Sequence, residues 1–319
     1  MLNGLLDRRV LILLGKGGAG TTTVAAALAR AAEQAGLRVL AMECDGRAPM
    51  CRLFGVQRSL EPVEVSDRLA AMVLDGRHAL EEYLHLVVPA RAVLRAVFSS
   101  RLYQFFVQAA PGLKELMMLG KVEYESERVP DDGRRRDLIV VDAPASGQAL
   151  SILRMPDAAR ETFGDSVVGR EANNIGRMLR DGRRCAAVLV TTPEQLAVSE
   201  TLETARSIRE MGIDLGAVIL NRSAAPHFSQ RDVAAFAERG RATRRAREVE
   251  RLVRLANLEL ERAAEANDAF RTLATRTRAP VARLEELYGL FGHPLTERLK
   301  LSLSAQFAAQ GAEKAEHRA

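Results

Sequence analysis

A glycine-rich loop constrains the fold of this chain more than any other sequence feature. The loop reads GKGGAGTTT over residues 15–23. It follows the apolar run 10–14 and opens an alanine-rich stretch in which we expect a helix over Thr22–Gly36. Glycines let successive backbone N–H groups turn toward phosphate oxygens, and a helix N-terminus adds positive potential. The pattern predicts a phosphate-binding loop formed by Gly15, Lys16, Gly17, Gly18, Ala19, Gly20, Thr21, Thr22 and Thr23.

Short apolar runs recur between helical stretches, as in a parallel sheet whose strands are buried on both faces. We therefore expect an α/β fold, with a mostly parallel P-loop sheet flanked by helices and a helical insertion. A hairpin of two short strands is expected over Val63–Val73. The other expected strands are Val10–Leu14, Arg38–Cys44, Asp137–Val141, Ala186–Thr191 and Leu215–Leu220.

The chain is expected to form a single domain over residues 1–319. A helical pattern interrupts the strand–helix alternation at about 76–130, and about 156–181 is expected to join the same insertion. An Arg- and Glu-rich helical part follows at about 230–278, and residues 308–319 are expected to form a frayed polar tail.

Composition excludes several classes of protein. Apolar residues make up 47% of the chain and charged residues 27%, which argues against a wholly disordered protein, and the net charge of +5 does not indicate nucleic acid as a partner. The cysteines Cys44, Cys51 and Cys185 form no CxxC pair, so we expect small apolar residues in a reducing cytoplasm. The N-terminus lacks a leader pattern, and no apolar run approaches 18 residues, so no transmembrane segment is expected.

Acidic residues end two of the expected strands, at the edge where a parallel sheet presents its ligand crevice. Asp142 closes an apolar strand in the manner of a Walker B motif, and we expect it to hold Mg²⁺ together with the Thr22 hydroxyl. Asp45 follows the second strand and faces the same crevice, although an aspartate there is also common as a loop cap. Gly147 gives the backbone after Asp142 the freedom to approach a phosphate.

The loop sequence GKGGAGTTT resembles the deviant Walker A motif GKGGxGKT[ST]. That motif marks the family of ArsA-type ATPases, the Get-pathway ATPase that targets tail-anchored proteins, MinD and ParA proteins and the nitrogenase iron protein. The segment DAPASGQALSILRMP resembles the switch signature DAPATGHxL…RLP of bacterial ArsA-like members. The resemblance covers most of residues 8–225 with its motifs in order. It implies an ATP-binding, Mg²⁺-dependent ATPase that works as a dimer.

The resemblance also implies roles for individual residues. Lys16 matches the signature lysine that reaches the nucleotide of the partner subunit, and Asp45 matches the aspartate that orients the attacking water. Asn221 matches the asparagine that binds adenine, and Pro193 belongs to the neighbouring wall of the base pocket. An asparagine at a strand end is also common as a turn residue.

Two positions depart from the family pattern. Thr21 stands where the family has the ordinary P-loop lysine, and Gln148 replaces the usual histidine of the switch signature. A neutral hydrogen bond is worth about 1 kcal/mol and one to a charged group about 1.5–3 kcal/mol, so we expect phosphate binding to weaken by about tenfold or more. Hydrolysis is expected to weaken further, and Arg47 is a candidate for the missing positive charge.

These features predict an ArsA/Get-type ATPase that acts as a nucleotide switch, either as a homodimer or as a heterodimer with an ArsA-like paralogue. The alternative is a catalytically inactive regulatory subunit that pairs with an intact paralogue. A MinD/ParA-like positioning ATPase is less favoured, as is an arsenite-pump ATPase, which would need three converging thiolates. A protein client at the insertion would use Met117, Met118, Phe105 and Phe106, which are more simply explained as core residues. The run Arg239–Arg254 is expected to be a solvated, ion-paired helix face.

Overall fold

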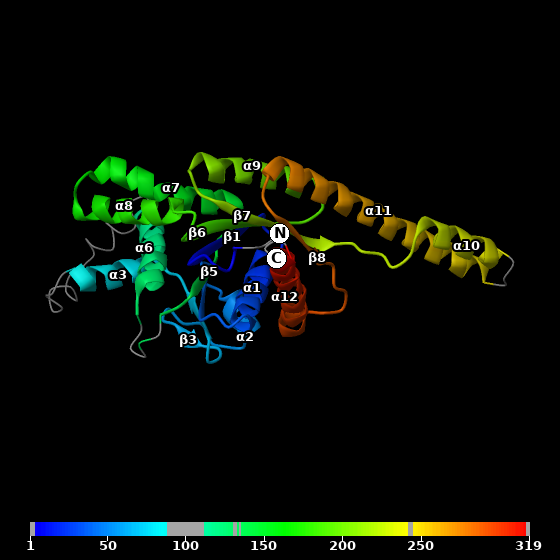
Figure 1. Cartoon of the computed structure of the whole chain (residues 1–319), viewed down its shortest axis with the longest axis horizontal. Coiled ribbons are helices and arrows are strands. Elements are labelled where there is room, and N and C mark those ends of the chain that lie inside the picture. The colour runs from blue at the N-terminus through cyan, green and yellow to red at the C-terminus, as the bar shows by residue number, and fades with distance from the viewer. Residues whose placement is uncertain (1–3, 88–111, 130–132, 134, 242–244, 317–319) are drawn as a thin grey trace.

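A computed structural model describes residues 4–87, 112–129, 133, 135–241 and 245–316 of the chain (Figure 1). In this part of the chain an eight-stranded sheet forms the centre, with the strand order β3-β4-β2-β5-β1-β6-β7-β8. The strands are β1 (Val10–Gly15), β2 (Val39–Glu43), β3 (Val63–Glu64), β4 (Leu69–Val73), β5 (Leu138–Asp142), β6 (Cys185–Thr191), β7 (Leu215–Ser223) and β8 (Val281–Glu285).

The strand directions confirm the predicted mostly parallel sheet. Every neighbouring pair is parallel except β3 and β4, which are antiparallel and form the hairpin expected over Val63–Val73. Strand β8, which pairs with β7 at the edge of the sheet, was not predicted from the sequence. Because the central strands are parallel, their carboxyl ends meet along one edge, where loops gather around a common crevice.

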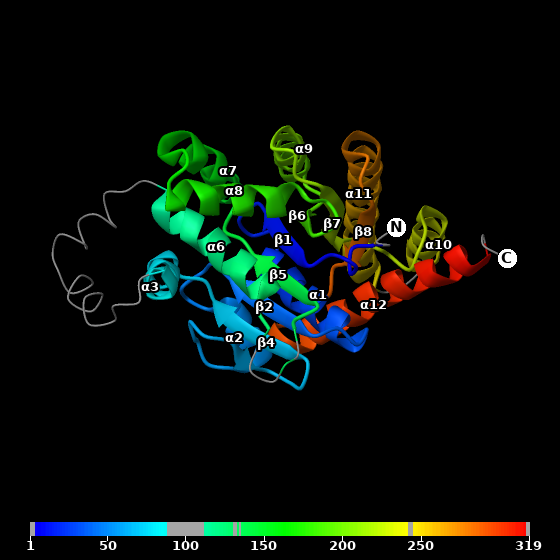
Figure 2. The same ribbon diagram turned by 60° about the vertical axis from the view of Figure 1, so that its left-hand side comes forward.

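Helices cover both faces of the sheet (Figure 2). The helices α1, α2 and α12 share one hydrophobic cluster with the sheet, and α3, α6, α7, α8, α9 and α11 share the other. The bounds are α1 (Thr21–Gln34), α2 (Pro49–Phe54), α3 (Gly76–Val87), α6 (Leu113–Glu127), α7 (Ser146–Phe163), α8 (Val167–Arg180), α9 (Gln195–Glu210), α10 (Gln230–Arg241), α11 (Ala246–Thr277) and α12 (Gly292–Glu316).

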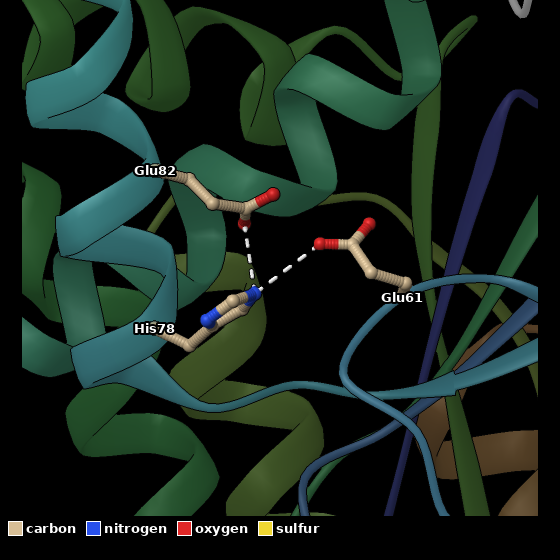
Figure 3. Close-up of side chains that lie close together, drawn as sticks. All are labelled: Glu61, His78 and Glu82. Carbon is tan, nitrogen blue, oxygen red and sulfur yellow. Dashed lines mark hydrogen bonds and ion pairs between the residues drawn. The ribbon is translucent and has the colours of Figure 1, made fainter. Parts of the chain in front are cut away.

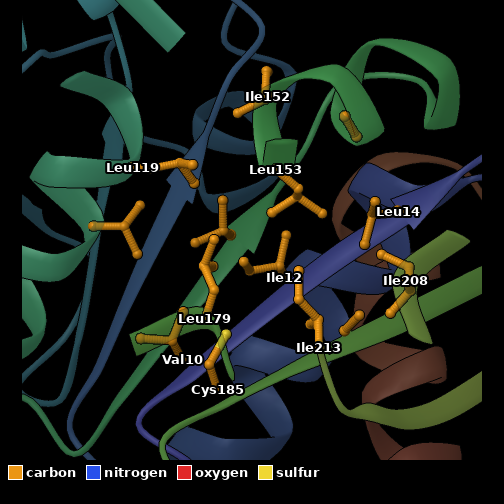
Figure 4. Packing of buried hydrophobic residues seen from close by; sticks show 14 of the residues in the cluster. Val10, Ile12, Leu14, Leu119, Ile152, Leu153, Leu179, Cys185, Ile208 and Ile213 are labelled. Atoms are coloured by element: carbon orange, nitrogen blue, oxygen red, sulfur yellow. The ribbon is translucent and has the colours of Figure 1, made fainter. Parts of the chain in front are cut away.

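The side chains of strand β1 pack into the hydrophobic clusters on both faces of the sheet. Val10, Ile12 and Leu14 point into the cluster formed with α6, α7 and α9 (Figure 4), whereas Leu11 and Leu13 belong to the cluster on the α1 face. All five side chains are at most 3% exposed. Successive side chains of a strand point to opposite faces, so a strand between two helical layers must be apolar at every position. Full burial of one such side chain stabilises the fold by about 1.5–3 kcal/mol.

Helices α3, α6 and α8 come from the two segments predicted as an insertion, as does the second half of α7, which begins before the predicted bound of about 156. Helix α6 packs against α3, α7 and α8, so these two segments meet in space. Met117 on α6 is buried, in agreement with the simpler core explanation. Phe105 and Phe106 lie outside the described residues.

The C-terminal third contains an arm and a long final helix. Helices α10 and α11 pack together and project from the body (Figure 1). Arg245 and Glu248 on this arm pair at 3.9 Å and are largely exposed, as expected for a solvated helix face. Helix α12 continues to Glu316. The expected polar tail over 308–319 stays a prediction. None of the described helices combines the length and apolar character needed to cross a membrane.

Candidate functional site

The glycine loop connects β1 directly to α1, as the sequence predicts. Gly18 and Gly20 adopt φ angles of +88° and +87°, which favour glycine because a Cβ would be strained there. A Cβ on Gly15 would lie 2.4 Å from Oγ1 of Thr21, so the loop folds closely over the first turn of the helix. No atom lies within 4 Å of the Cβ position of Gly17 or Gly18 in the described structure. The backbone of the loop is therefore accessible to a ligand.

A pocket of about 930 Å³, which we call the loop pocket, opens at the carboxyl ends of β1, β2 and β5. Its walls come from the glycine loop, the segment after β2, the turn after β5 and the first turns of α3 and α6. Ala19, Thr23, Pro193 and Asn221 are not among the residues that line it. The predicted residues that it brings together are Gly15, Lys16, Gly17, Gly18, Gly20, Thr21, Thr22, Asp45, Arg47, Asp142 and Gln148.

Asp142 occupies the end of β5 with only 4% of its surface exposed. Burial raises its pKa to about 7; a hydrogen bond with Thr22 opposes this shift, and the charges of Glu43 and Asp45 reinforce it. Oδ1 of Asp142 is buried and has no hydrogen-bond partner among the described residues. An unpartnered carboxylate oxygen beside a threonine hydroxyl is a donor set of the kind that Mg²⁺ prefers. The residues present therefore fit the predicted magnesium site.

Asp45 is bound by Arg47 on both carboxylate oxygens. The Nη2 atom of Arg47 donates to Oδ2 at 2.8 Å, and the backbone N–H of Arg47 donates to Oδ1 at 2.9 Å. These hydrogen bonds lower the pKa of Asp45, so it is charged at neutral pH. The Arg47 side chain is 86% exposed, which leaves it room to move away. The sequence predicts that Asp45 orients the attacking water and that Arg47 supplies positive charge to a phosphate. Both roles require this ion pair to open.

Glu43 positions the segment that carries Asp45, a role that no sequence motif indicates. Its side chain is completely buried at the end of β2. Its two carboxylate oxygens accept hydrogen bonds from the backbone N–H groups of Met50 and Cys51, at 2.8 and 2.9 Å. A carboxylate at a helix N-terminus satisfies otherwise unpaired donors. Glu43 therefore ties α2 to the sheet and fixes both ends of the loop that contains Asp45.

Lys16 forms an ion pair within its own chain. Its Nζ atom lies 2.8 Å from Oε1 of Glu200, which is carried by α9. The two side chains are 36% and 38% exposed. An ion pair this accessible to water contributes about 0–1 kcal/mol, so it can open at small cost.

Asn221 holds the glycine loop against β7. Its Nδ2 atom donates to the backbone oxygen of Ala19 at 2.8 Å, and its side chain is buried. A Cβ on Gly20 would lie 2.6 Å from the same Nδ2 atom, so this contact requires glycine at that position. The role of Asn221 in binding adenine stays a prediction, as does that of Pro193 in the segment between β6 and α9.

Three further cations line the loop pocket: Arg77, Lys114 and Arg222. Arg77 is hydrogen-bonded to Glu81, whereas Lys114 and Arg222 form no ion pair with any residue that the structure describes. Arg222 has a φ angle of +53° where the pairing of β7 with β8 is irregular, a conformation that costs of order 1–3 kcal/mol for a non-glycine residue. No local motif marks these residues, because α3, α6 and β7 meet only in the folded chain.

The cysteines do not form a common site. Cys44 follows β2 at the carboxyl edge of the sheet, whereas Cys185 begins β6 at the opposite edge. Burial raises the pKa of Cys51 and of Cys185 to about 12, which keeps both thiols protonated. All three cysteines belong to the described residues, so a site of three converging thiolates within one chain is excluded.

Comparisons with known proteins agree with the motifs. The family described as anion-transporting ATPases matches residues 8–171, half of the chain. ATPase BagA of Mycobacterium tuberculosis is 30% identical over 237 residues, which cover 72% of this chain and 69% of that protein. A candidate arsenical pump-driving ATPase of Chlorobaculum tepidum is 26% identical over 157 residues, which cover 47% of this chain and 36% of that protein. The chain therefore belongs to the ArsA-like family of anion-transporting ATPases.

Proposed function

We propose that this chain binds ATP with Mg²⁺ in the loop pocket and acts as a dimeric nucleotide switch with weak hydrolysis. The observation that carries the proposal is the meeting of the glycine loop, the Thr22 hydroxyl and the unpartnered oxygen of Asp142 in one pocket. Backbone N–H groups and the N-terminus of α1 attract the phosphates of the nucleotide. Membership of an ATPase family supports the same conclusion.

Thr22 and Asp142 would hold Mg²⁺, which supplies positive charge to the phosphate oxygens when it is bound. Asp45 acts on the attacking water. Both of its oxygens are engaged by Arg47, so Asp45 can accept a hydrogen bond from that water only after the pair has opened. Opening also releases the Arg47 guanidinium toward the pocket that it lines. A single rearrangement of the segment after β2 therefore prepares both residues.

Thr21 leaves the glycine loop without the lysine that usually contacts the β- and γ-phosphates. Lys114 and Arg222 line the same pocket and form no ion pair with any described residue, so their charges are available to an anion. We assign part of the missing phosphate contact to these two cations. A point charge held at the pocket wall is less well placed than a lysine within the loop, which accounts for weak hydrolysis.

Lys16 acts across the dimer interface in this proposal. Its ion pair with Glu200 occupies the ammonium group within the chain, so the pair must open before Lys16 can reach a second subunit. Nucleotide phosphates offer the ammonium a partner with greater charge than one carboxylate. Exchange of Glu200 for nucleotide therefore couples ATP binding to dimer formation.

The proposal is tested by measuring ATP affinity and turnover for the wild type, Thr21→Lys and Asp142→Asn, with and without Mg²⁺. We expect wild-type binding to depend on Mg²⁺, and Asp142→Asn to lose that dependence. Thr21→Lys should tighten ATP binding by about tenfold and raise turnover, because a charged donor replaces a neutral one. Asp67→Asn, an exposed substitution in the turn between β3 and β4, is the matched control and should change neither property. A wild-type chain that binds no ATP in the presence of Mg²⁺ would contradict the proposal.

A regulatory subunit without activity of its own is the second candidate. Thr21 favours the regulatory subunit, as do the hydrogen bonds from Arg47 to both carboxylate oxygens of Asp45. Turnover of the isolated chain separates the two candidates. Wild-type hydrolysis that is lost in Asp45→Asn identifies an enzyme, whereas hydrolysis seen only in Thr21→Lys identifies a regulatory subunit with an intact nucleotide site.

A further inference from the structure

A second cluster of metal-ligating side chains lies away from the loop pocket. Glu61 belongs to the segment between α2 and β3, and His78 and Glu82 are one turn apart on α3. Figure 3 shows both carboxylates directed toward the Nε2 atom of the imidazole. One ligand atom from each residue can be chosen so that all three lie within 4.8 Å of one another. The cluster thus joins two segments that flank the β3–β4 hairpin in the chain.

The two separations that involve His78 are close to those between neighbouring ligands of a tetrahedral metal site. Nε2 of His78 lies 3.3 Å from Oε1 of Glu61 and 3.9 Å from Oε2 of Glu82. Bonds of about 2.0–2.2 Å to a tetrahedral zinc ion place neighbouring ligand atoms about 3.3–3.6 Å apart. A movement of a few tenths of an ångström would bring Glu82 to this distance. At 3.9 Å, Glu82 is too far from His78 for a hydrogen bond.

The hydrogen bonding of the Glu82 carboxylate supports a metal site independently of these distances. Its Oε2 atom is buried and has no hydrogen-bond partner within the described part of the chain. The other oxygen, Oε1, lies 2.8 Å from Nζ of Lys121, which fixes the orientation of the carboxylate. A buried acceptor left without a partner costs about 1–3 kcal/mol or more when it is charged. The unpartnered oxygen is therefore held in place and directed at the imidazole, as a metal ligand must be.

Charge balance at the cluster favours a cation. Glu61, Glu82 and Glu125 contribute three negative charges, and Lys121 and Arg128 contribute two positive charges. His78 in its neutral form adds none. The group therefore carries an excess negative charge that a divalent ion would offset. Glu61 and Glu82 also line a pocket of about 490 Å³, which gives an ion a route from solvent.

We propose that Glu61, His78 and Glu82 form a binding site for a divalent transition-metal ion of the zinc class. One imidazole nitrogen with two carboxylates suits Zn²⁺ better than Mg²⁺ or Ca²⁺, which prefer oxygen ligands alone. Three protein ligands leave a coordination position for water or an exogenous ligand. The bound ion would tie the segment before β3 to α3, whose first residues Gly76 and Arg77 line the loop pocket. This site is independent of the nucleotide site.

The test uses the full-length chain freed of metal by chelation and then titrated calorimetrically with Zn²⁺ in the absence of nucleotide. We expect one Zn²⁺ per wild-type chain. The variants His78→Ala and Glu82→Gln should bind it at least about tenfold more weakly, because each removes a ligand. Co²⁺ in place of Zn²⁺ provides a second readout, since the visible absorption of a low-coordinate ion should appear in the wild type and be lost in His78→Ala.

The chain offers a matched control in another helix. His293 and Glu297 have the same spacing and the same 3.9 Å separation between Nε2 and a carboxylate oxygen as His78 and Glu82. In the described structure no third ligand joins them. His293→Ala should therefore leave Zn²⁺ binding unchanged.

Equal Zn²⁺ affinity in the wild type and His78→Ala would overturn the proposal, as would the absence of binding by the wild type. Should either variant on α3 fail to fold, Glu61→Gln decides the question, because the Glu61 side chain is 58% exposed and its loss is compatible with folding. Zn²⁺ should raise the melting temperature of the wild type and not that of Glu61→Gln. ATP binding is measured separately, so failure of the metal proposal and failure of the nucleotide proposal are distinguishable.

Discussion

Two lysines of this chain bind a glutamate at the same distance in very different surroundings. The Nζ atom of Lys16 lies 2.8 Å from Glu200, and that of Lys121 lies 2.8 Å from Glu82. The Lys16 side chain is 36% exposed, whereas that of Lys121 is 5% exposed. Water can solvate both Lys16 and Glu200 when they separate, but it cannot easily reach Lys121. Burial, rather than distance, decides which pair can open during function.

Lys121 belongs to the fixed framework between α3 and α6. It also lies 3.0 Å from Glu125, whose side chain is 4% exposed. Burial alone would lower the pKa of Lys121, but its interactions with Glu82 and Glu125 outweigh that effect and raise it. Lys121 therefore stays charged and holds the Glu82 carboxylate in the orientation that the proposed metal site needs.

The largest effect is expected from breaking the buried pair. Lys121→Met leaves Glu82 without its ammonium partner and leaves Glu125 paired with Arg128 alone, so we expect the free energy of unfolding to fall by about 3 kcal/mol, the lower end of the range for a broken buried pair. Urea denaturation of the metal-free chain measures this change. In Lys121→Met combined with Glu82→Gln, part of the loss should be recovered, because one uncompensated charge is removed. A loss below about 1 kcal/mol in the single variant would show that the pair is not part of the framework.

An intermediate effect is expected from removing the ammonium of the exposed pair. Lys16→Met should weaken ATP-dependent dimerisation by about tenfold or more, because a charged contact worth about 1.5–3 kcal/mol is lost. Analytical ultracentrifugation with and without ATP measures the association. Folding stability should change little, since the ion pair is accessible to water. An unchanged dimer affinity would argue against a role of Lys16 across the interface.

The smallest effect is expected from removing the other member of that pair. Glu200→Gln should favour ATP-dependent dimerisation by at most about fivefold, because opening an exposed ion pair costs about 0–1 kcal/mol. Glu203→Gln, an exposed position on the same helix, is the control and should have no effect. The difference between the two variants should shrink at high salt, which screens exposed charges. Weaker dimerisation in Glu200→Gln would mean that Glu200 supports the interface instead of competing with it.

The success of the fold prediction depends on how strongly each segment is buried. Four of the five central strands were predicted to within one residue of their ends, and the fifth, β7, extends three residues beyond its predicted end, because strands covered on both faces are apolar throughout. Strand β8 was missed because it is short and reads VARLE, in which Arg283 and Glu285 interrupt the apolar run that marks the central strands. The guanidinium of Arg283 in this strand lies 3.9 Å from the ring centre of Phe270. Local sequence patterns do not predict this contact.

The candidate site also has parts that could be predicted from the sequence and parts that could not. The glycine loop, Thr22 and Asp142 could be predicted, because each lies at a junction between a strand and a helix whose place is encoded locally. The partners of these residues could not. Glu200 is 184 residues from Lys16, and Glu61 is 17 residues from His78 across a hairpin. Such pairs depend on how helices pack on the sheet, which local sequence patterns do not specify.

Local sequence patterns were enough to predict the parallel sheet and the glycine loop and to reveal the departure at Thr21, because strand periodicity, glycine conformation and side-chain chemistry act within a few residues. The packed fold alone specified which charged side chains pair with one another among the described residues. It placed Arg47 on Asp45, Glu200 on Lys16, and Lys114 and Arg222 at the wall of the loop pocket. Electrostatic interactions act through space and depend on burial, so their partners and strengths exist only once the layers have packed.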